Sequence, residues 1–82
     1  MIVEDHRYIS CGGDPFNYLR SVFKALSIDM DQGQEAKIMI MTEKFPYERR
    51  IFESLATTTK LEIHEFKKIN DETHIIVLKP MR

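Results

Sequence analysis

The order of apolar and polar residues along the chain predicts four strands and two helices. Helices are expected over residues 15–28 and 46–58, because apolar side chains recur there three and four positions apart and form one apolar face. Strands are expected where aliphatic and aromatic residues gather in short runs, over residues 2–10, 36–42, 60–69 and 73–79.

Two of the strands have patterns that predict their place or their shape. Residues 36–42 hold four consecutive apolar side chains, which predicts a strand that is central in the sheet or buried on both faces. In the third strand, Phe66 is out of phase with Leu61 and Ile63, which predicts a β-bulge or a strand end near Glu65.

The first strand has the weakest pattern of the four. Its β-forming residues lie at its two ends, and the polar run 4–7 separates them. We therefore expect only the part nearest Cys11, with Tyr8 and Ile9, to pair firmly.

The resulting order of elements is β-α-β-α-β-β. Each helix joins two strands by a crossover, and such crossovers are right-handed, so both helices are expected on the same face of the sheet. Asn70 and Asp71 supply a short turn between the last two strands, which predicts an antiparallel hairpin. The expected fold class is α/β, a two-layer sandwich of a four-stranded mixed sheet with two helices on one face. Residues 1–82 contain no repeat, low-complexity segment or linker, which predicts a single domain.

Composition and charge narrow the classes of function. A net charge of −1 argues against a general nucleic-acid binder, which would be strongly basic. A single cysteine rules out an internal disulfide and suits a reducing compartment. The chain has no apolar run long enough for a signal peptide or a membrane span, so a cytoplasmic protein is expected.

No motif for metal binding or small-molecule catalysis stands out. The histidines at 6, 64 and 74 and the cysteine at 11 lack the short spacings of metal sites, so no metal is expected. The three histidines are expected at the surface. No Ser/His/Asp or Cys/His set occurs at a convincing spacing.

Candidate chemistry concentrates where the first strand runs into the first helix. Asp14 is a natural N-cap, since its side-chain oxygen can accept a hydrogen bond from a free amide of the first turn. Pro15 suits the first helical position, where its missing N–H costs nothing. Gly12 and Gly13 are expected to form a turn that needs a positive φ, because their spacing matches neither a P-loop nor a dinucleotide-binding fingerprint. Cys11 precedes the cap by three residues.

This layout resembles that of the TusA/SirA-like sulfur-carrier family over about residues 3–79. Members of that family have a Cys-Pro-x-Pro motif between the first strand and the first helix, where this chain has Cys11-Gly-Gly-Asp-Pro15. In the following helix, Leu19-Arg20 and Phe23-Lys24 are similar to the family's pairs of an apolar and a basic residue. Residues 38–46 are similar to its second strand and the loop into a proline-started helix.

The resemblance implies both a function and a site. In the family, the cysteine carries a persulfide sulfur from a donor protein to an acceptor protein, with no bound cofactor. Cys11 would be the catalytic residue, and Gly12, Gly13, Asp14 and Pro15 the motif at the helix start. The motif departs from the family's, because no proline follows Cys11 and one extra residue separates it from Pro15.

Local electrostatics leave two interpretations of Cys11 open. A helix N-terminus favours a thiolate, whereas the carboxylate of Asp14 disfavours one. Cys11 is either a reactive thiol or a small apolar residue at a strand end.

The chain also resembles the Alba-type DNA- and RNA-binding proteins, which have the same order of elements. Their Gly-Lys-Lys-Pro loop and Asn-Tyr pair are similar to residues 12–15 and Asn17-Tyr18, although the two lysines are replaced here. The side chains expected to form a partner or nucleic-acid surface are those of Arg20, Lys24, Lys44, Arg49 and Arg50. Protein partners are favoured over nucleic acid, and a module that docks or dimerises through its sheet or hairpin is a third interpretation.

Overall fold

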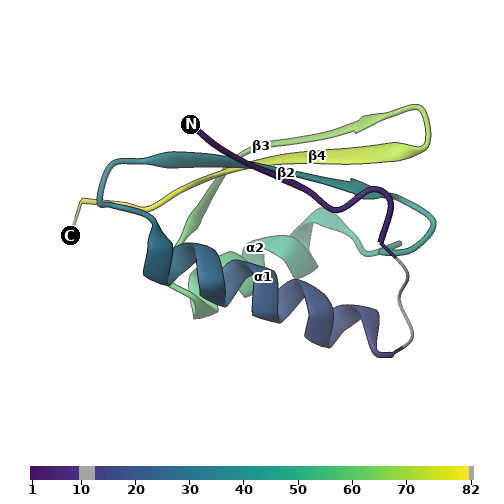
Figure 1. Cartoon of the computed structure of the whole chain (residues 1–82), viewed down its shortest axis with the longest axis horizontal. Coiled ribbons are helices and arrows are strands. Elements are labelled where there is room, and N and C mark those ends of the chain that lie inside the picture. The colour runs from purple at the N-terminus through teal and green to yellow at the C-terminus, as the bar shows by residue number, and fades with distance from the viewer. Residues whose placement is uncertain (10–12, 82) are drawn as a thin grey trace.

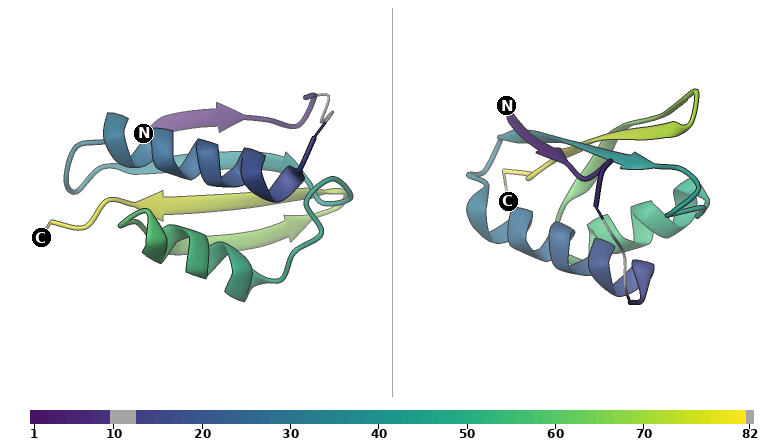
Figure 2. Two further views of the ribbon diagram at one scale, coloured as in Figure 1. Left: turned by 90° about the horizontal axis from the view of Figure 1, so that it is seen from below. Right: turned by 45° about the vertical axis from the view of Figure 1, so that its right-hand side comes forward.

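The computed structural model describes residues 1–9 and 13–81 and contains the six elements that the sequence predicts (Figure 1). In chain order they are β1 (Ile2–Asp5), α1 (Pro15–Asp29), β2 (Glu35–Met41), α2 (Arg49–Thr58), β3 (Glu62–Ile69) and β4 (Glu72–Leu78). Both helices lie on one face of the four-stranded sheet, as the two views of Figure 2 show. The predicted two-layer α/β sandwich is confirmed.

The sheet is mixed, with the strand order β1-β2-β4-β3. β1 runs parallel to β2, and β4 runs antiparallel to both β2 and β3. The predicted hairpin is confirmed, because Ile69 pairs with Glu72 and Asn70 takes a left-handed φ of 55° in the turn between them.

Burial alternates along the two central strands. β2 buries Ala36, Ile38 and Ile40, and β4 buries every second residue beside it. These side chains face the helices, whereas Met39 and Met41 point to the open face and are half-buried. The apolar run in β2 therefore reflects a central strand and not one that is buried on both faces.

A β-bulge in β3 brings Phe66 into the same layer as Ile63. The pairing with β4 shifts between Ile63, opposite Val77, and Glu65, opposite Ile76. His64 is thus the extra residue, and Phe66 regains the helix side opposite the buried Ile75. The bulge predicted from the phase of Phe66 is confirmed.

The first strand pairs at the end opposite to the one predicted. Its register with β2 runs from Ile2 opposite Ala36 to Asp5 opposite Met39, and Tyr8 and Ile9 lie beyond the strand. The prediction was wrong because β1 is an edge strand, and an edge strand can direct polar side chains such as that of Asp5 to solvent without losing its ladder.

The second helix begins three residues later than predicted, at Arg49 rather than Pro46. The segment before it forms a turn in which the N–H of Tyr47 donates to the carbonyl of Phe45 at 2.8 Å. Phe45 is buried, and its ring lies 5.9 Å from that of Tyr18. Because this ring is buried, the backbone stays non-helical up to Glu48. The side chain of Glu48 makes no capping hydrogen bond.

The C-terminal end of α1 is tied to the residue that follows β4. The ammonium of Lys79 donates to the carbonyl oxygens of Ser27 at 2.7 Å and Met30 at 2.9 Å. These carbonyls have no partner within the helix, so Lys79 satisfies the groups that a helix C-terminus leaves free.

Candidate functional site

The start of α1 has the predicted capping geometry. Asp14 is extended, with φ −79° and ψ 114°, and its Oδ1 accepts a hydrogen bond from the N–H of Phe16 at 3.0 Å. Pro15 occupies the first turn, where it removes no helical bond. Gly13 is exposed, with no atom within 4 Å of the place that a Cβ atom would take, and the turn expected over Gly12 and Gly13 stays a prediction because Gly12 lies outside the described residues.

Cys11 and Gly12 lie outside the described residues. Covalent geometry alone limits their distance from the helix start, since each residue spans at most about 3.6 Å. The Cα atom of Cys11, three residues before Asp14, is therefore within about 11 Å of the capping residue.

The described residues on the N-terminal side of this connection are anchored to two other elements. The Nδ1 atom of His6 lies 2.7 Å from the hydroxyl of Tyr18 on α1, and the two rings meet edge to face at 5.5 Å. The ammonium of Lys44 donates to the carbonyl of Ile9 at 2.5 Å. Together with the cap at Asp14, these bonds hold both ends of the segment that contains Cys11.

His6 is buried more deeply than its sequence context indicates. Its side chain is 17% exposed, and its Nε2 atom is fully buried without a hydrogen-bond partner among the described residues. The nearest acidic group is the carboxylate of Glu4, 3.8 Å from this nitrogen. His74 is similarly covered, so the expectation of surface histidines holds only for His64.

The five basic residues expected to form one surface are divided among three places. Lys44 is bound to Ile9, as described above. On α2, Arg49 pairs with Glu53 at 3.4 Å, and Arg50 pairs with Glu48 at 2.8 Å. Arg20 and Lys24 are the two of these five residues that line the same open groove, which lies between α1 and the C-terminal end of α2.

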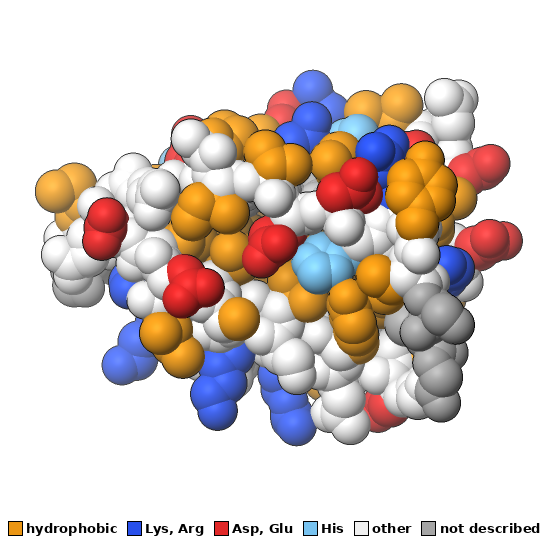
Figure 3. All heavy atoms as spheres, in the orientation of Figure 1, with side chains coloured by type: hydrophobic (Ala, Val, Ile, Leu, Met, Phe, Trp, Pro, Cys, Tyr) orange, Lys and Arg blue, Asp and Glu red, His pale blue; other side chains and the backbone are white. Residues whose placement is uncertain are grey.

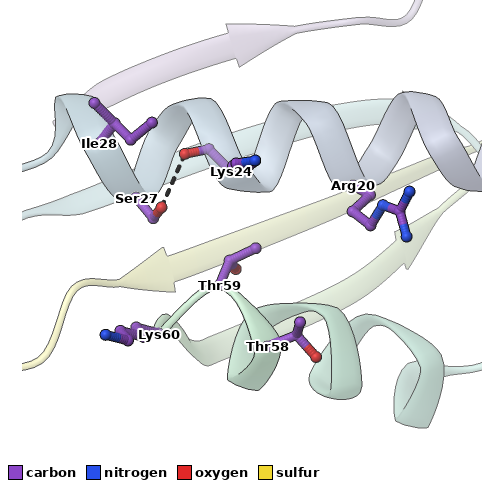
Figure 4. A pocket seen from close by; sticks show the side chains of 7 residues that line it. All are labelled: Arg20, Lys24, Ser27, Ile28, Thr58, Thr59 and Lys60. Atoms are coloured by element: carbon purple, nitrogen blue, oxygen red, sulfur yellow. Dashed lines mark hydrogen bonds between the residues drawn. The ribbon is translucent and has the colours of Figure 1, made fainter.

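This groove has a volume of about 470 Å³ (Figure 4). Its lining consists of Arg20, Lys24, Ser27, Ile28, Thr58, Thr59 and Lys60. The sequence shows Lys60 as a basic residue at a helix end, but nothing in the local pattern places it opposite α1. Lys and Arg side chains are prominent on the helix side of the molecule in the space-filling view (Figure 3).

A separate charged network lies on the open face of the sheet. Arg7 binds the carboxylate of Asp5 at 2.8 Å and reaches Glu72 on β4 at 3.3 Å, across the end of β2. The hydrogen bonds from Arg7 lower the pKa of Asp5 to about 2. Hydrogen bonds from His74, and then from Arg7, lower the pKa of Glu72. These pairs are partly exposed and make structural links between strands.

Within residues 1–9 and 13–81, no group of three or more His, Cys, Asp or Glu side chains is placed to hold a metal ion. None of the helices in this part of the chain has the length and apolar character needed to cross a bilayer.

Comparison with known proteins gives no match: no family model, no curated protein and no solved structure is significantly similar to the chain.

Proposed function

We propose that the chain is a small sulfur carrier, in which Cys11 accepts a persulfide sulfur from one protein and passes it to another. The proposal joins the resemblance of the sequence to the TusA/SirA-like family with the β-α-β-α-β-β sandwich of the structure. No metal or bound cofactor takes part in this transfer. The partners are a donor protein with a persulfide and an acceptor protein with a nucleophile.

The observation that carries the proposal is the position of Cys11 in the chain relative to α1. Two residues separate it from Asp14, so its Cα atom lies within about 11 Å of the capping residue of a 15-residue helix. The partial positive charge of a helix N-terminus favours the thiolate, which is the form that attacks sulfur. The Oδ1 atom of Asp14 is engaged by the N–H of Phe16, so this carboxylate is directed to the helix amides.

The transfer is a pair of thiol exchange steps that need no oxidant. The Cys11 thiolate attacks the terminal sulfur of the donor persulfide, a new S–S bond forms, and the donor thiolate leaves. An acceptor nucleophile then attacks the terminal sulfur on Cys11. This second step restores the Cys11 thiolate, and any proton released is taken up by solvent.

Mass spectrometry of the intact protein tests the proposal. The protein is incubated with a cysteine desulfurase and cysteine, and the expected result is a gain of one sulfur atom, removed by a thiol reductant. Cys11→Ser should abolish the gain while leaving the circular dichroism spectrum and the unfolding midpoint unchanged. Since Cys11 is the single cysteine, the site needs no further mapping.

A rate comparison separates a carrier from an ordinary accessible thiol. The folded protein should take up sulfur faster than a synthetic peptide of residues 6–14, which contains the same cysteine without the helix. Equal rates, or no sulfur gain in the folded protein, would exclude a carrier role.

A further inference from the structure

The groove between α1 and α2 concentrates positive charge that no acidic side chain among the described residues neutralises. Arg20, Lys24 and Lys60 are exposed and form no ion pair with another described residue. None of the seven described residues that line the groove is acidic. In a chain of net charge −1, three unpaired cations in one place indicate complementarity to a negatively charged ligand.

Lys60 takes a backbone conformation that disfavours its side chain. Its φ is 63°, in the left-handed region that follows a helix C-terminus and is normally occupied by glycine or asparagine. A lysine at this position is strained relative to glycine. This left-handed turn ends α2 and brings Lys60 to the groove that Arg20 and Lys24 line.

The hydroxyl groups of the groove favour a ligand that has N–H groups. Ser27 donates its proton to the carbonyl of Lys24 at 2.8 Å, and Thr58 and Thr59 donate theirs to carbonyls of α2 at 2.9 Å. Each of these oxygens therefore keeps lone pairs that can accept an N–H group of a ligand. A peptide has such groups, whereas a phosphate has none. The C-terminal turns of both helices also lie here, and their negative partial charge offsets part of the attraction of the groove's basic side chains for an acidic ligand.

The α1 side of the groove combines charge with apolar surface. Arg20, Lys24 and Ile28 are spaced four residues apart and make a stripe about 12 Å long, at 1.5 Å per residue, which winds around α1 from Arg20 on the side toward α2 to Ile28 at the other edge (Figure 4). Ile28 is 72% exposed. A ligand that matches this stripe has two negative groups followed by an apolar one.

We propose that this groove is a docking site for an acidic segment of a partner protein. Carboxylates of the segment pair with Arg20, Lys24 and Lys60, and an apolar side chain packs on Ile28. Backbone N–H groups donate to the hydroxyl oxygens of Ser27, Thr58 and Thr59. The proposal does not depend on sulfur transfer at Cys11, which lies in the connection at the opposite end of α1.

Fluorescence anisotropy with a labelled peptide, Glu-Glu-Leu-Glu-Glu-Leu-Glu, tests the site. Lys24→Glu should weaken binding of this peptide about ten-fold or more, since it replaces an attraction by a repulsion. Arg50→Glu makes the same change in net charge on the outer side of α2 and should leave the dissociation constant within about two-fold. Equal weakening in the two variants, or no binding of the peptide to the native protein, would overturn the proposal.

Competition identifies the class of ligand. A peptide with leucine in place of every glutamate should not displace the probe, which shows that the carboxylates are needed. Inorganic phosphate and a single-stranded RNA heptamer should also fail to displace it at equal concentration of negative charge. Displacement by the RNA at lower concentrations than by unlabelled peptide would assign the groove to nucleic acid instead.

Lys60→Gly gives a test in which stability and binding change in opposite directions. Glycine relieves the left-handed strain, so the unfolding midpoint should rise. The same variant loses one cation of the groove, so peptide affinity should fall. A rise in stability with unchanged affinity would show that Lys60 takes no part in the site.

Discussion

The Nδ1 atom of His6, just after β1, and the hydroxyl of Tyr18, near the start of α1, are 2.7 Å apart. This bond joins the two elements on either side of the segment that contains Cys11, and it is partly buried. The described structure thus fixes the entrance to the first helix by a side-chain contact as well as by the cap at Asp14.

Tyr18→Phe should destabilise the fold by about 1 kcal/mol, because it leaves a partly buried ring nitrogen of His6 without this partner. Urea unfolding followed by circular dichroism measures the effect. Tyr8→Phe is the matched control, since Tyr8 is 83% exposed, and it should change stability by less than about 0.5 kcal/mol. Equal effects of the two substitutions would show that the His6–Tyr18 bond is not stabilising.

The bulge in β3 gives a prediction about a deletion. Removing His64 abolishes the extra residue and leaves Ile63 and Phe66 two positions apart, so both should stay on the helix side of a regular ladder at a cost of less than about 1 kcal/mol. Removing both His64 and Glu65 makes Ile63 and Phe66 adjacent, so one of them must turn to the open face, and the expected loss is about 2–3 kcal/mol, the free energy of burying one large apolar side chain. His64→Ala keeps the residue count and should cost less than about 0.5 kcal/mol. A loss of about 2–3 kcal/mol on removing His64 alone, or equal stabilities of the single and double deletions, would contradict the register described above.

Arg7 and Asp5 give a prediction about pH. Arg7→Gln should raise the pKa of Asp5 from about 2 toward its ordinary value of 3.8. The hydrogen bonds from the guanidinium of Arg7 are the largest cause of the lowered pKa, and the variant loses them. Carbon-13 NMR titration of the carboxyl group measures both values. Arg50→Gln, which removes a surface charge far from β1 in the chain, should leave the pKa of Asp5 where it is.

The sign of the linked stability effect follows from the direction of this shift. The pKa of Asp5 is lower in the folded chain than in the unfolded chain, so the ionised form stabilises the fold. This stabilisation is complete above pH 3.8 and is lost as the pH falls through about 2. In Arg7→Gln the loss of this contribution on acidification should be smaller, as acid unfolding curves of the two proteins would reveal.

Lys79→Met should destabilise the protein by about 1–2 kcal/mol, because two carbonyls at the end of α1 lose a charged donor. Hydrogen exchange should quicken at the amides of the last turn of α1. Lys67→Met is the control, since Lys67 is exposed and its ion pair with Glu65 lies at the surface. Unchanged exchange in Lys79→Met would mean that the helix end does not depend on this ammonium.

Features that depend on a few neighbouring residues were predictable from the sequence. The cap at Asp14 and Pro15 needs only the local order of residues. The bulge at His64 was visible because Phe66 is out of phase with Ile63, and both must face the same core. The order of elements and the single helical layer follow from the same apolar periods and from the handedness of crossovers.

Features that depend on distant partners were not predictable in this way. β1 pairs with β2 through Ile2–Asp5. This register is set by the position of β2 in the folded chain, and the sequence near β1 does not encode it. The late start of α2 results from burial of Phe45. The groove requires Lys60 to approach Arg20 and Lys24, which are far away in the chain and meet it only when the helices pack side by side.

The strand that completes the sheet is the last one to be made. β4 lies between β2 and β3, so β3 has no partner in the sheet until β4 has been synthesised. A nascent chain that ends before residue 72 cannot cover the apolar faces of its two helices with a complete sheet, nor close the end of α1 with Lys79. Completion of the fold is therefore expected to wait until residues 72–79 have been synthesised, and a chain truncated before residue 72 should be held by chaperones or degraded by proteases.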